Sequence, residues 1–312
     1  MAKSEIRVSV VLCTTFSSSL VERTVESIVN QEIDRRFVEL ILVINGKCGG
    51  VEIGFLDKYK GNFNIVVLKE KRLGLSRARN RGLNAARGEF VAFIDDDAIA
   101  DRCWLKNILE IFENADSRVA CIGGKVLPIW ESGRPRWLSD RMMTALSLVD
   151  EGNRAFCVRS GKSFLAGTNL VFRKSVLVKY LGFRADLGRV GSRLISNEEN
   201  YIIECTIRDG YRVLYAPSII VFHVVKKERL KKGWFYRRMF YQGISNGVMD
   251  SLILKKYPLF FLKRLFLTFF YLCLLTYLFF ILFLPVVHSL IFTIKCHILI
   301  PAGYIWFYFY KN

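Results

Sequence analysis

The sequence contains no CxxC pair, no internal repeat and no low-complexity linker. Its eight cysteines are scattered along the chain, which excludes a disulfide framework and a zinc-finger pattern and is typical of a reducing compartment. The N-terminal stretch MAKSEIRVSVV lacks the pattern of a signal peptide and leads directly into an apolar run. We therefore expect the bulk of the chain to lie in the cytosol.

Acidic residues are scarce: 28 Asp and Glu stand against 46 Lys and Arg, which gives a net charge of +18. Such a charge implies a polyanionic partner, which is a nucleic acid, an anionic lipid or a phosphorylated substrate. The hydrophobic fraction of 52% and the mean hydropathy of +0.26 are high for a soluble protein, and the apolar excess collects after Pro258. This distribution predicts a soluble domain followed by membrane segments.

A run of three carboxylates, Asp95, Asp96 and Asp97, ends the apolar, strand-like stretch Phe90–Ile94. Adjacent acids repel one another, so a cation is expected beside them. A hard divalent ion with oxygen ligands, Mn²⁺ or Mg²⁺, fits this chemistry and commonly bridges to phosphates. The alternative is an acidic turn that caps the next helix.

The N-terminal half alternates strand-like and helix-like segments, which predicts an α/β fold with a mostly parallel sheet. The expected strands are Arg7–Cys13, Glu39–Ile44, Ile65–Leu68 and Phe90–Ile94, and the expected helices are Leu20–Asn30 and Ser76–Ala86. Ligands of such sheets bind beyond the carboxyl ends of the strands. Thr14, Asn45 and Asp95–Asp97 all follow strand ends, so we expect them to converge on one crevice.

Three arginines, Arg77, Arg79 and Arg81, fall in the first turns of the second expected helix. Cations are unfavourable at a helix N-terminus, and a bound phosphate removes that conflict. The alternative is a solvated basic face.

Two polar residues lie within apolar segments and have two interpretations each. Asn169, in FLAGTNLVF, is either a hydrogen-bonded core residue or a contact to a substrate hydroxyl. His223, in the second of two strands expected on either side of Ala216 and Pro217, is either a satisfied core histidine or a ligand.

The segment SNEEN opens a helix that we expect to run to Asp209 and to end at Gly210. Ser196 and Glu199 match an S-x-x-E capping box, which is a purely structural interpretation. The functional interpretation is that a carboxylate here acts as a general base, and Glu198 is free to take either role.

The stretch from Lys226 to the end of the chain predicts association with a membrane. The stretch from Lys226 interleaves cations with aromatic residues, as expected for an interfacial helix, and its place before the membrane segments argues against nucleic acid. Leu265–Val287 has no charged residue and is long enough to span a bilayer, while Ser289–Tyr310 is a weaker, kinked or re-entrant candidate. Upstream cations place the soluble domain on the cytoplasmic side of the inner membrane.

We expect three parts: a catalytic domain at 1–225, a basic amphipathic interfacial segment at 226–264 and one or two transmembrane helices at 265–312. The first part resembles the inverting family 2 glycosyltransferases of GT-A fold. The resemblance covers roughly residues 7–245 and rests on VSVVLCTTFSSSLVERTVESIVNQ, ELILVINGK, GLSRARNRGLNAARGEFVAFIDDD, AGTNLVFRK and NEENYIIECTIRDGYRVLYAPSIIVFH. The resemblance depends on the order of these segments more than on any single one of them.

The resemblance implies a nucleotide-sugar donor, with a UDP-sugar favoured. Thr14 and Asn45 would flank the base of the nucleotide, and Arg79 would lie beside the nucleotide and diphosphate. Asp95 and Asp96 would hold the ribose and the metal-bound diphosphate.

It also implies a metal site and an acceptor side. Asp97 would be the main ligand of Mn²⁺ or Mg²⁺, with Asp95 beside it, and His223 matches a histidine near the diphosphate. Gly167 and Asn169 would help to form the acceptor side.

The catalytic base falls at Glu199, where the family has the Asp of a Glu-Asp pair, and Glu198 remains an alternative. A second departure is Ile44, where the family has an Asp, which leaves the base selectivity open. The QxxRW signature of processive synthases is absent, which favours transfer of a single sugar.

The implied function is therefore sugar transfer to a lipid-linked or glycan acceptor near the membrane. Three alternatives differ in class: a catalytically silent, membrane-anchored nucleotide-sugar-binding protein, a metal-dependent nucleotidyl- or phosphotransferase, and a nucleic-acid-binding module.

Overall fold

The computed structural model describes residues 5–16, 20–46, 53–160, 165–253, 265–274 and 285–310. The chain divides into two compact units. The first comprises Met1–Ile129, Ser147–Asp186 and Glu198–Val224, and the second comprises Trp130–Leu146, Leu187–Asn197 and Val225–Asn312.

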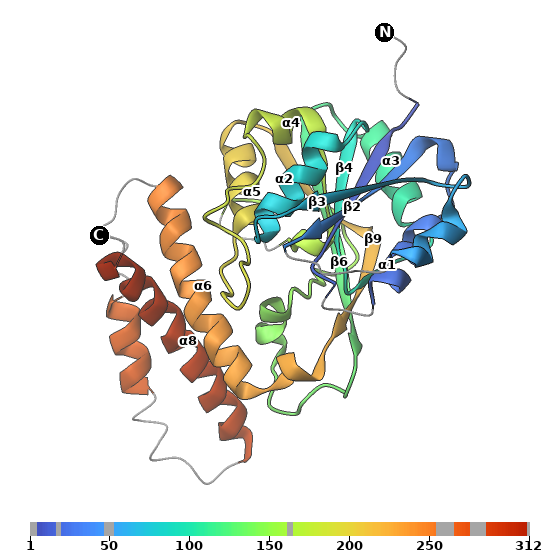
Figure 1. The fold of residues 1–312 in the computed structure, drawn as a ribbon. Helices are drawn as coiled ribbons and strands as arrows, with labels where there is room; N and C mark the ends of the chain where they lie inside the picture. The colour runs from blue at the N-terminus through green and yellow to red at the C-terminus, as the bar shows by residue number, and fades with distance from the viewer. Residues whose placement is uncertain are drawn as a thin grey trace. The chain divides into compact units, whose positions relative to one another are not determined.

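The first unit begins with four parallel strands, as predicted (Figure 1). They are β1 (Val8–Thr14), β2 (Val38–Asn45), β3 (Asn64–Glu70) and β4 (Phe90–Asp95), in the spatial order β3-β2-β1-β4. The helices α1 (Val21–Val29) and α2 (Leu75–Ala85) connect strands of this group. Continuous runs of β-branched and aliphatic residues explain why β1, β2 and β4 are buried on both faces, whereas the edge strand β3 is partly exposed.

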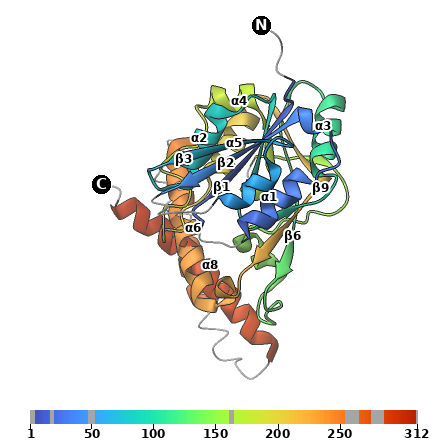
Figure 2. The same cartoon turned by 45° about the vertical axis from the view of Figure 1, so that its right-hand side comes forward.

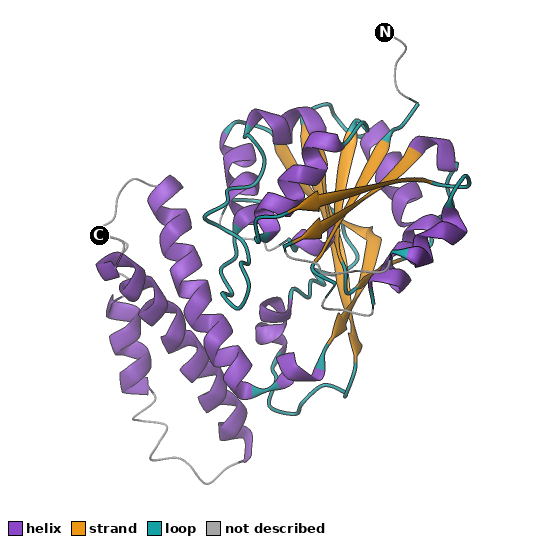
Figure 3. Ribbon diagram, viewed as in Figure 1, coloured by secondary structure: helices purple, strands orange, loops and turns teal. Residues whose placement is uncertain are grey.

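Helices cover both faces of these strands (Figure 3). Alternate strand residues such as Val10, Leu40 and Ala92 pack with α1 and with α3 (Trp104–Asn114) in one core cluster. On the opposite face α2 approaches β1 so closely that a Cβ atom at Gly82 would overlap the side chain of Val11. A glycine in this helix therefore lets the helix axis lie close to the sheet.

The later strands extend the sheet to the order β3-β2-β1-β4-β8-β6-β9-β5, with β7 paired to β9. β8 joins β4 and β6 in antiparallel fashion, and Figure 2 shows β6 and β9 beside each other. The elements are β5 (Ala98–Ala100), β6 (Val119–Trp130), β7 (Phe156–Cys157), β8 (Leu170–Arg173), β9 (Arg212–Val225), α4 (Lys174–Lys179) and α5 (Glu198–Arg208). Short 3₁₀ helices lie at Arg35–Phe37, Gly54–Tyr59, Asp140–Leu146, Gly167–Asn169 and Lys227–Leu230.

Two local predictions are wrong. The two strands expected around Pro217 form the single strand β9, because β7 pairs at Leu214 and Tyr215 while β5 pairs from Val221 onward, leaving Pro217 between the two pairings. The capping box at Ser196 is also absent from this segment: the Ser196 hydroxyl donates to Gln242 Oε1 at 3.3 Å, and α5 begins two residues later.

The second unit contains two long helices, α6 (Lys232–Ile253) and α8 (Pro285–Tyr310), which lie side by side (Figures 1 and 2). A Cβ atom at Gly243 would overlap the carbonyl oxygen of Ile300, and one at Gly303 would overlap that of Phe240. The two backbones are therefore in direct contact, as in membrane helix pairs with small residues at the interface.

The described residues include one helix long and apolar enough to cross a membrane, Leu290–Phe309. This is the candidate that the sequence ranked as the weaker one, and its helix continues through Pro301. Of the first candidate, Leu265–Leu274 is helical, and residues 275–284 lie outside the described part of the chain. Most of the exposed large apolar side chains that the structure describes belong to these two helices, including Phe266, Phe269, Trp306 and Phe309.

Substitution of Gly243 by alanine tests the contact between α6 and α8. We expect the free energy of unfolding to fall by about 1–3 kcal/mol, because the added methyl group would overlap the backbone of the neighbouring helix. Gly233→Ala in the same helix is the matched control: nothing lies within 4 Å of its added Cβ, so the better helix former should be neutral or stabilising. Unfolding in detergent measures the stability of both variants. Equal losses in Gly243→Ala and Gly233→Ala would contradict the close contact between α6 and α8.

Candidate active site

The carboxyl ends of the parallel strands bring the predicted polar residues together. In the register of the sheet Cys13 of β1 lies beside Asp95 of β4, and Thr14 lies beside Ile44 of β2. The Thr14 hydroxyl donates to Asp96 Oδ2 at 2.5 Å, which connects the ends of β1 and β4 directly. The predicted convergence of Thr14, Asn45 and the acidic run at one edge is therefore present.

Arg79 of α2 is the centre of the site. Its side chain is 4% exposed, and it donates to Asp95 Oδ1 at 3.2 Å and to Glu198 Oε1 at 3.0 Å. The guanidinium carbon also lies 5.9 Å from the ring centre of Phe93 and 5.5 Å from that of Phe183. Burial alone lowers the pKa of Arg79, but the carboxylates of Asp95 and Glu198 outweigh this effect and raise it. One fixed cation thus joins the end of β4 to the start of α5.

Gly167 makes room for this cation. A Cβ atom at Gly167 would lie 2.8 Å from one terminal nitrogen of Arg79 and 2.9 Å from the other. Thr168, the next residue, accepts a hydrogen bond from the Asp95 backbone N–H at 3.3 Å. The GTN segment predicted to form the acceptor side therefore contacts the arginine and the aspartate of the site.

Glu198 and Glu199 form a buried carboxyl pair in the first turn of α5, 3% and 9% exposed respectively. The Oε2 atom of each is buried and accepts no hydrogen bond from the residues that the structure describes. Burial and the neighbouring charge of Glu199 raise the pKa of Glu198 to about 8, against the opposing effect of Arg79. The environment of this pair therefore favours the neutral form of Glu198 more than solvent does.

Asp97 is buried and lies against His223, with 3.3 Å between Oδ1 and Nε2. The pairing of β5 with β9 sets this contact, since His223 lies opposite Ala98 in the register. No group of three or more His, Cys, Asp or Glu side chains suited to a metal occurs within the described ranges. Ions that bridge to phosphates often use only one or two protein carboxylates, so the oxygen donors of Asp95 and Asp97 fit such an ion.

Two predicted contacts have partners inside the protein. The Asn45 amide donates to the carbonyl oxygens of Glu70 and Arg72 and accepts from the Gly74 N–H, so it fixes the loop after β3. Asn169 has no exposed surface. It accepts from Trp104 Nε1 and donates to two carbonyl oxygens, all at 2.9–3.0 Å. Asn169 thus has the geometry of the hydrogen-bonded core alternative, and its role at an acceptor stays a prediction.

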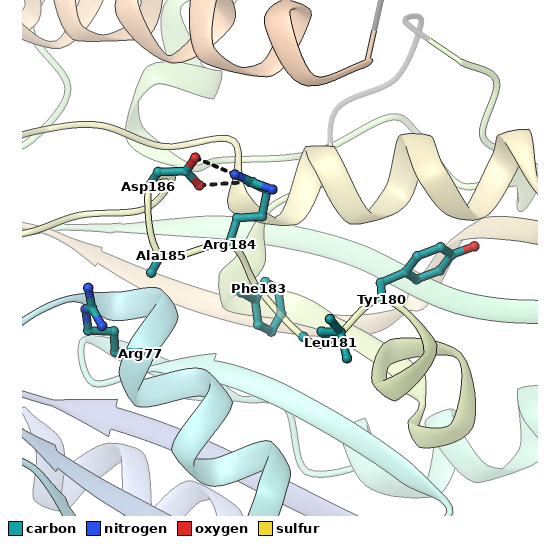
Figure 4. A pocket seen from close by; sticks show the side chains of 8 residues that line it. Arg77, Tyr180, Leu181, Phe183, Arg184, Ala185 and Asp186 are labelled. Atoms are coloured by element: carbon teal, nitrogen blue, oxygen red, sulfur yellow. Dashed lines mark hydrogen bonds and ion pairs between the residues drawn. The ribbon is translucent and has the colours of Figure 1, made fainter.

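A groove of about 650 Å³ lies beside the site, between Arg77 of α2 and residues 180–186 (Figure 4). Arg184 forms two hydrogen bonds with Asp186 in its lining, and Phe183, also in the lining, is one of the two rings that lie beside Arg79. No sequence pattern predicted a role for residues 180–186. The one turn signal of this segment in the sequence is Gly182, and in the structure both Leu181 and Gly182 have positive φ angles, 60° and 73°.

These features define a class: an α/β protein of GT-A-like fold whose acidic edge, buried arginine and paired glutamates share one site. The family model "Glycosyl transferase family 2" matches residues 9–181, and the chain belongs to this family. It is a glycosyltransferase, as its motifs predicted.

The comparisons with individual proteins agree with this assignment. The chain is 29% identical over 253 residues to a glucosyl-dolichyl phosphate glucuronosyltransferase of Haloferax volcanii, covering 79% of this chain and 78% of the relative. The mannosyltransferase PcManGT of Pyrobaculum calidifontis, in complex with GDP-Man and Mn²⁺, has a TM-score of 0.60 at 18% identity over 95% of this chain and 72% of that one. S. aureus TarS 1-349 in complex with UDP has a TM-score of 0.53 at 19% identity, over 77% and 65%. The GT-A fold and the family are thereby confirmed.

Proposed function

We propose that this protein moves one sugar from a nucleotide-diphosphate sugar, with a UDP-sugar as the favoured donor, to a hydroxyl of a lipid-linked or polysaccharide-precursor acceptor at the membrane. The observation that carries the proposal is the buried Arg79, which contacts both the acidic end of β4 and the carboxyl pair of α5. One group thus links the proposed donor-binding edge to the carboxyl pair that would supply the proton acceptor.

The donor would lie along the strand ends. Thr14 and Asn45 would flank the nucleotide base, and the partly exposed Asp95 and Asp96 would hold the ribose and the diphosphate. Asp97, with Asp95 beside it, would hold Mn²⁺ or Mg²⁺, and His223 would lie near the diphosphate. A bound ion of this kind supplies positive charge to the departing diphosphate.

The reaction would then proceed by direct displacement. The acceptor oxygen attacks the anomeric carbon, the bond to the diphosphate breaks, and the configuration is inverted. Glu199 accepts the acceptor's proton, while Arg79 fixes the neighbouring Glu198. Glu198 is the second candidate for this base. The groove beside Phe183 offers space for an acceptor.

Three observations support a membrane-bound acceptor. The helix Leu290–Phe309 is long and apolar enough to span a bilayer, and exposed aromatic side chains cluster on it and on Leu265–Leu274. The Haloferax relative is named for a dolichyl phosphate substrate. We infer an inner-membrane protein with its catalytic domain on the cytoplasmic side, without a nucleic-acid partner.

The proposal is tested by release of nucleoside diphosphate from purified, detergent-held protein across a panel of nucleotide sugars, with and without Mn²⁺ and with membrane lipid extract. We expect metal-dependent release from one donor and its loss in Asp97→Asn, because the carboxamide cannot supply an anionic ligand. Asp140→Asn, an exposed carboxylate, is the control. Tight nucleotide binding without turnover in the presence of lipid extract would refute the enzyme and favour the silent binding protein.

A further inference from the structure

The helix α4 ends in a turn that forms one wall of the groove (Figure 4). The N–H of Leu181 donates to the carbonyl oxygen of Val178 at 2.9 Å, and the N–H of Gly182 donates to that of Leu177 at 3.0 Å. This pair of hydrogen bonds is the Schellman arrangement, in which the first donor residue is left-handed and is usually glycine. Here it is Leu181, with a φ of 60° and 90% exposed. A bulky residue is unfavourable in this conformation, so the turn needs support from elsewhere in the fold.

Asn80 of α2 holds the residue that follows this turn. Its Nδ2 donates to the Phe183 carbonyl oxygen at 2.7 Å, and its Oδ1 accepts from the Phe183 N–H at 2.7 Å. One side chain thus satisfies both backbone polar groups of a residue 103 positions away. A Cβ atom at Gly182 would lie 2.3 Å from Asn80 Oδ1, so the turn can approach α2 this closely only because it has a glycine there.

The ring of Phe183 is fixed at the same point. The residue is 3% exposed, and its ring lies edge-on to those of Phe93 and Phe172, with 5.0 Å and 6.2 Å between ring centres. Phe183 is therefore held twice, by its backbone on Asn80 and by its ring in the core. The chain that continues into Arg184 leaves from a fixed point, and it completes the lining of the groove.

We propose that Asn80 is a positioning residue for acceptor binding, which holds residues 181–184 in the shape that gives the groove its wall. The inference rests on the proposed function, since that function places the acceptor in this groove. A wall that is already ordered spares the acceptor the cost of ordering it, which raises the affinity. Two adjacent residues of α2 then have separate roles: Arg79 joins the acidic edge to the carboxyl pair, and Asn80 shapes the groove.

Asn80→Leu removes both hydrogen bonds with a side chain of similar size. The Phe183 N–H and carbonyl oxygen then lack partners, which favours release of the turn. If the released turn has its present shape about one tenth of the time, the amount of membrane lipid extract that gives half the maximal transfer rate rises about 10-fold. The KM for the donor should not change. A merely structural loss of folded protein would lower the maximal rate and leave this half-saturating amount as it is.

Gly182→Ala disturbs the same contact from the other side, because the added methyl group meets Asn80 Oδ1. We expect a similar rise in the half-saturating amount of lipid extract, and this variant carries the test alone if Asn80→Leu does not fold. Its control is Gly152→Ala, which has a positive φ of 89° but nothing within 4 Å of the added Cβ. The control for Asn80→Leu is Asn84→Leu, which removes an exposed amide one turn later in α2. Both controls should match the wild type in half-saturating amount.

Hydrogen–deuterium exchange of peptides that cover residues 181–184 gives a readout that does not depend on activity. We expect faster exchange there in Asn80→Leu and Gly182→Ala, and unchanged exchange in both controls. A wild-type protein that transfers no sugar refutes the proposed function, and exchange then decides whether Asn80 holds the turn. Unchanged exchange in both variants overturns the inference, and so does faster exchange with an unchanged half-saturating amount of lipid extract.

Discussion

Replacing Glu199 by glutamine is expected to lower kcat for sugar transfer by about 10²–10⁴-fold, the range typical of a lost general base. The carboxamide has the size of the carboxylate but cannot accept the acceptor's proton. Because the donor is proposed to bind along the strand ends and not on α5, the KM for the donor and the affinity for the nucleotide should change little. Initial rates at saturating donor and acceptor give the measurement.

The same experiment on Glu198 decides which carboxylate is the base. In the wild type the pKa of Glu198 is raised to about 8 by burial and by the charge of Glu199. If Glu198 were the base, wild-type kcat would rise as the pH passes through about 8. Glu199→Gln would then move that rise to lower pH, because it removes the negative charge that helps to raise the pKa. A kcat that is already maximal at neutral pH, together with a larger loss in Glu199→Gln than in Glu198→Gln, assigns the base to Glu199.

Replacing Arg79 by methionine is expected to destabilise the protein by about 3–5 kcal/mol and to abolish transfer, because Asp95 and Glu198 are left without their shared cation. Lysine does not restore the site, since a single ammonium lacks the planar fork that reaches both carboxylates. Denaturant unfolding in detergent, followed by the transfer assay on any folded fraction, measures both effects.

The matched control is Arg81→Met, which removes an exposed arginine from the same helix. Surface changes of this kind are usually within about 0.5 kcal/mol of the wild type. Similar losses of stability in Arg79→Met and Arg81→Met would mean that the net charge of α2 matters and that the contacts of Arg79 do not.

Much of the fold could be predicted because its signals are local. The strands β1, β2 and β4 are continuous apolar runs, and parallel topology alone places Thr14, Asn45 and Asp95 at one edge. A local pattern also gave one wrong prediction. Ser196 and Glu199 match a capping box, but Ser196 forms hydrogen bonds with Ser245 and Gln242 of α6 instead. No pattern near Ser196 reports on residues that lie almost fifty positions further along the chain.

The central contact of the site could not be predicted. Arg79 and Glu198 are separated by 119 positions, and a basic helix without its partners is equally consistent with a solvated face. The same limit applies to Asn169, whose partners Trp104, Lys125 and Ile219 come from three other elements. Burial makes an asparagine's hydrogen bonds necessary, but it does not identify the atoms that supply them.

The glycine contacts between α6 and α8 limit how this helix pair can respond to a bilayer. Helices separated by long side chains can slide past one another when the surrounding lipid becomes thinner or thicker. Here the backbone at Gly243 lies against Ile300 and the backbone at Gly303 lies against Phe240, so sliding would drive main chain into main chain. If α8 spans a bilayer as proposed, a change in bilayer thickness would therefore be met by a common tilt of both helices. A change in lipid composition would then tilt α6 together with α8. Bilayer thickness is therefore a variable to control in any assay of this protein.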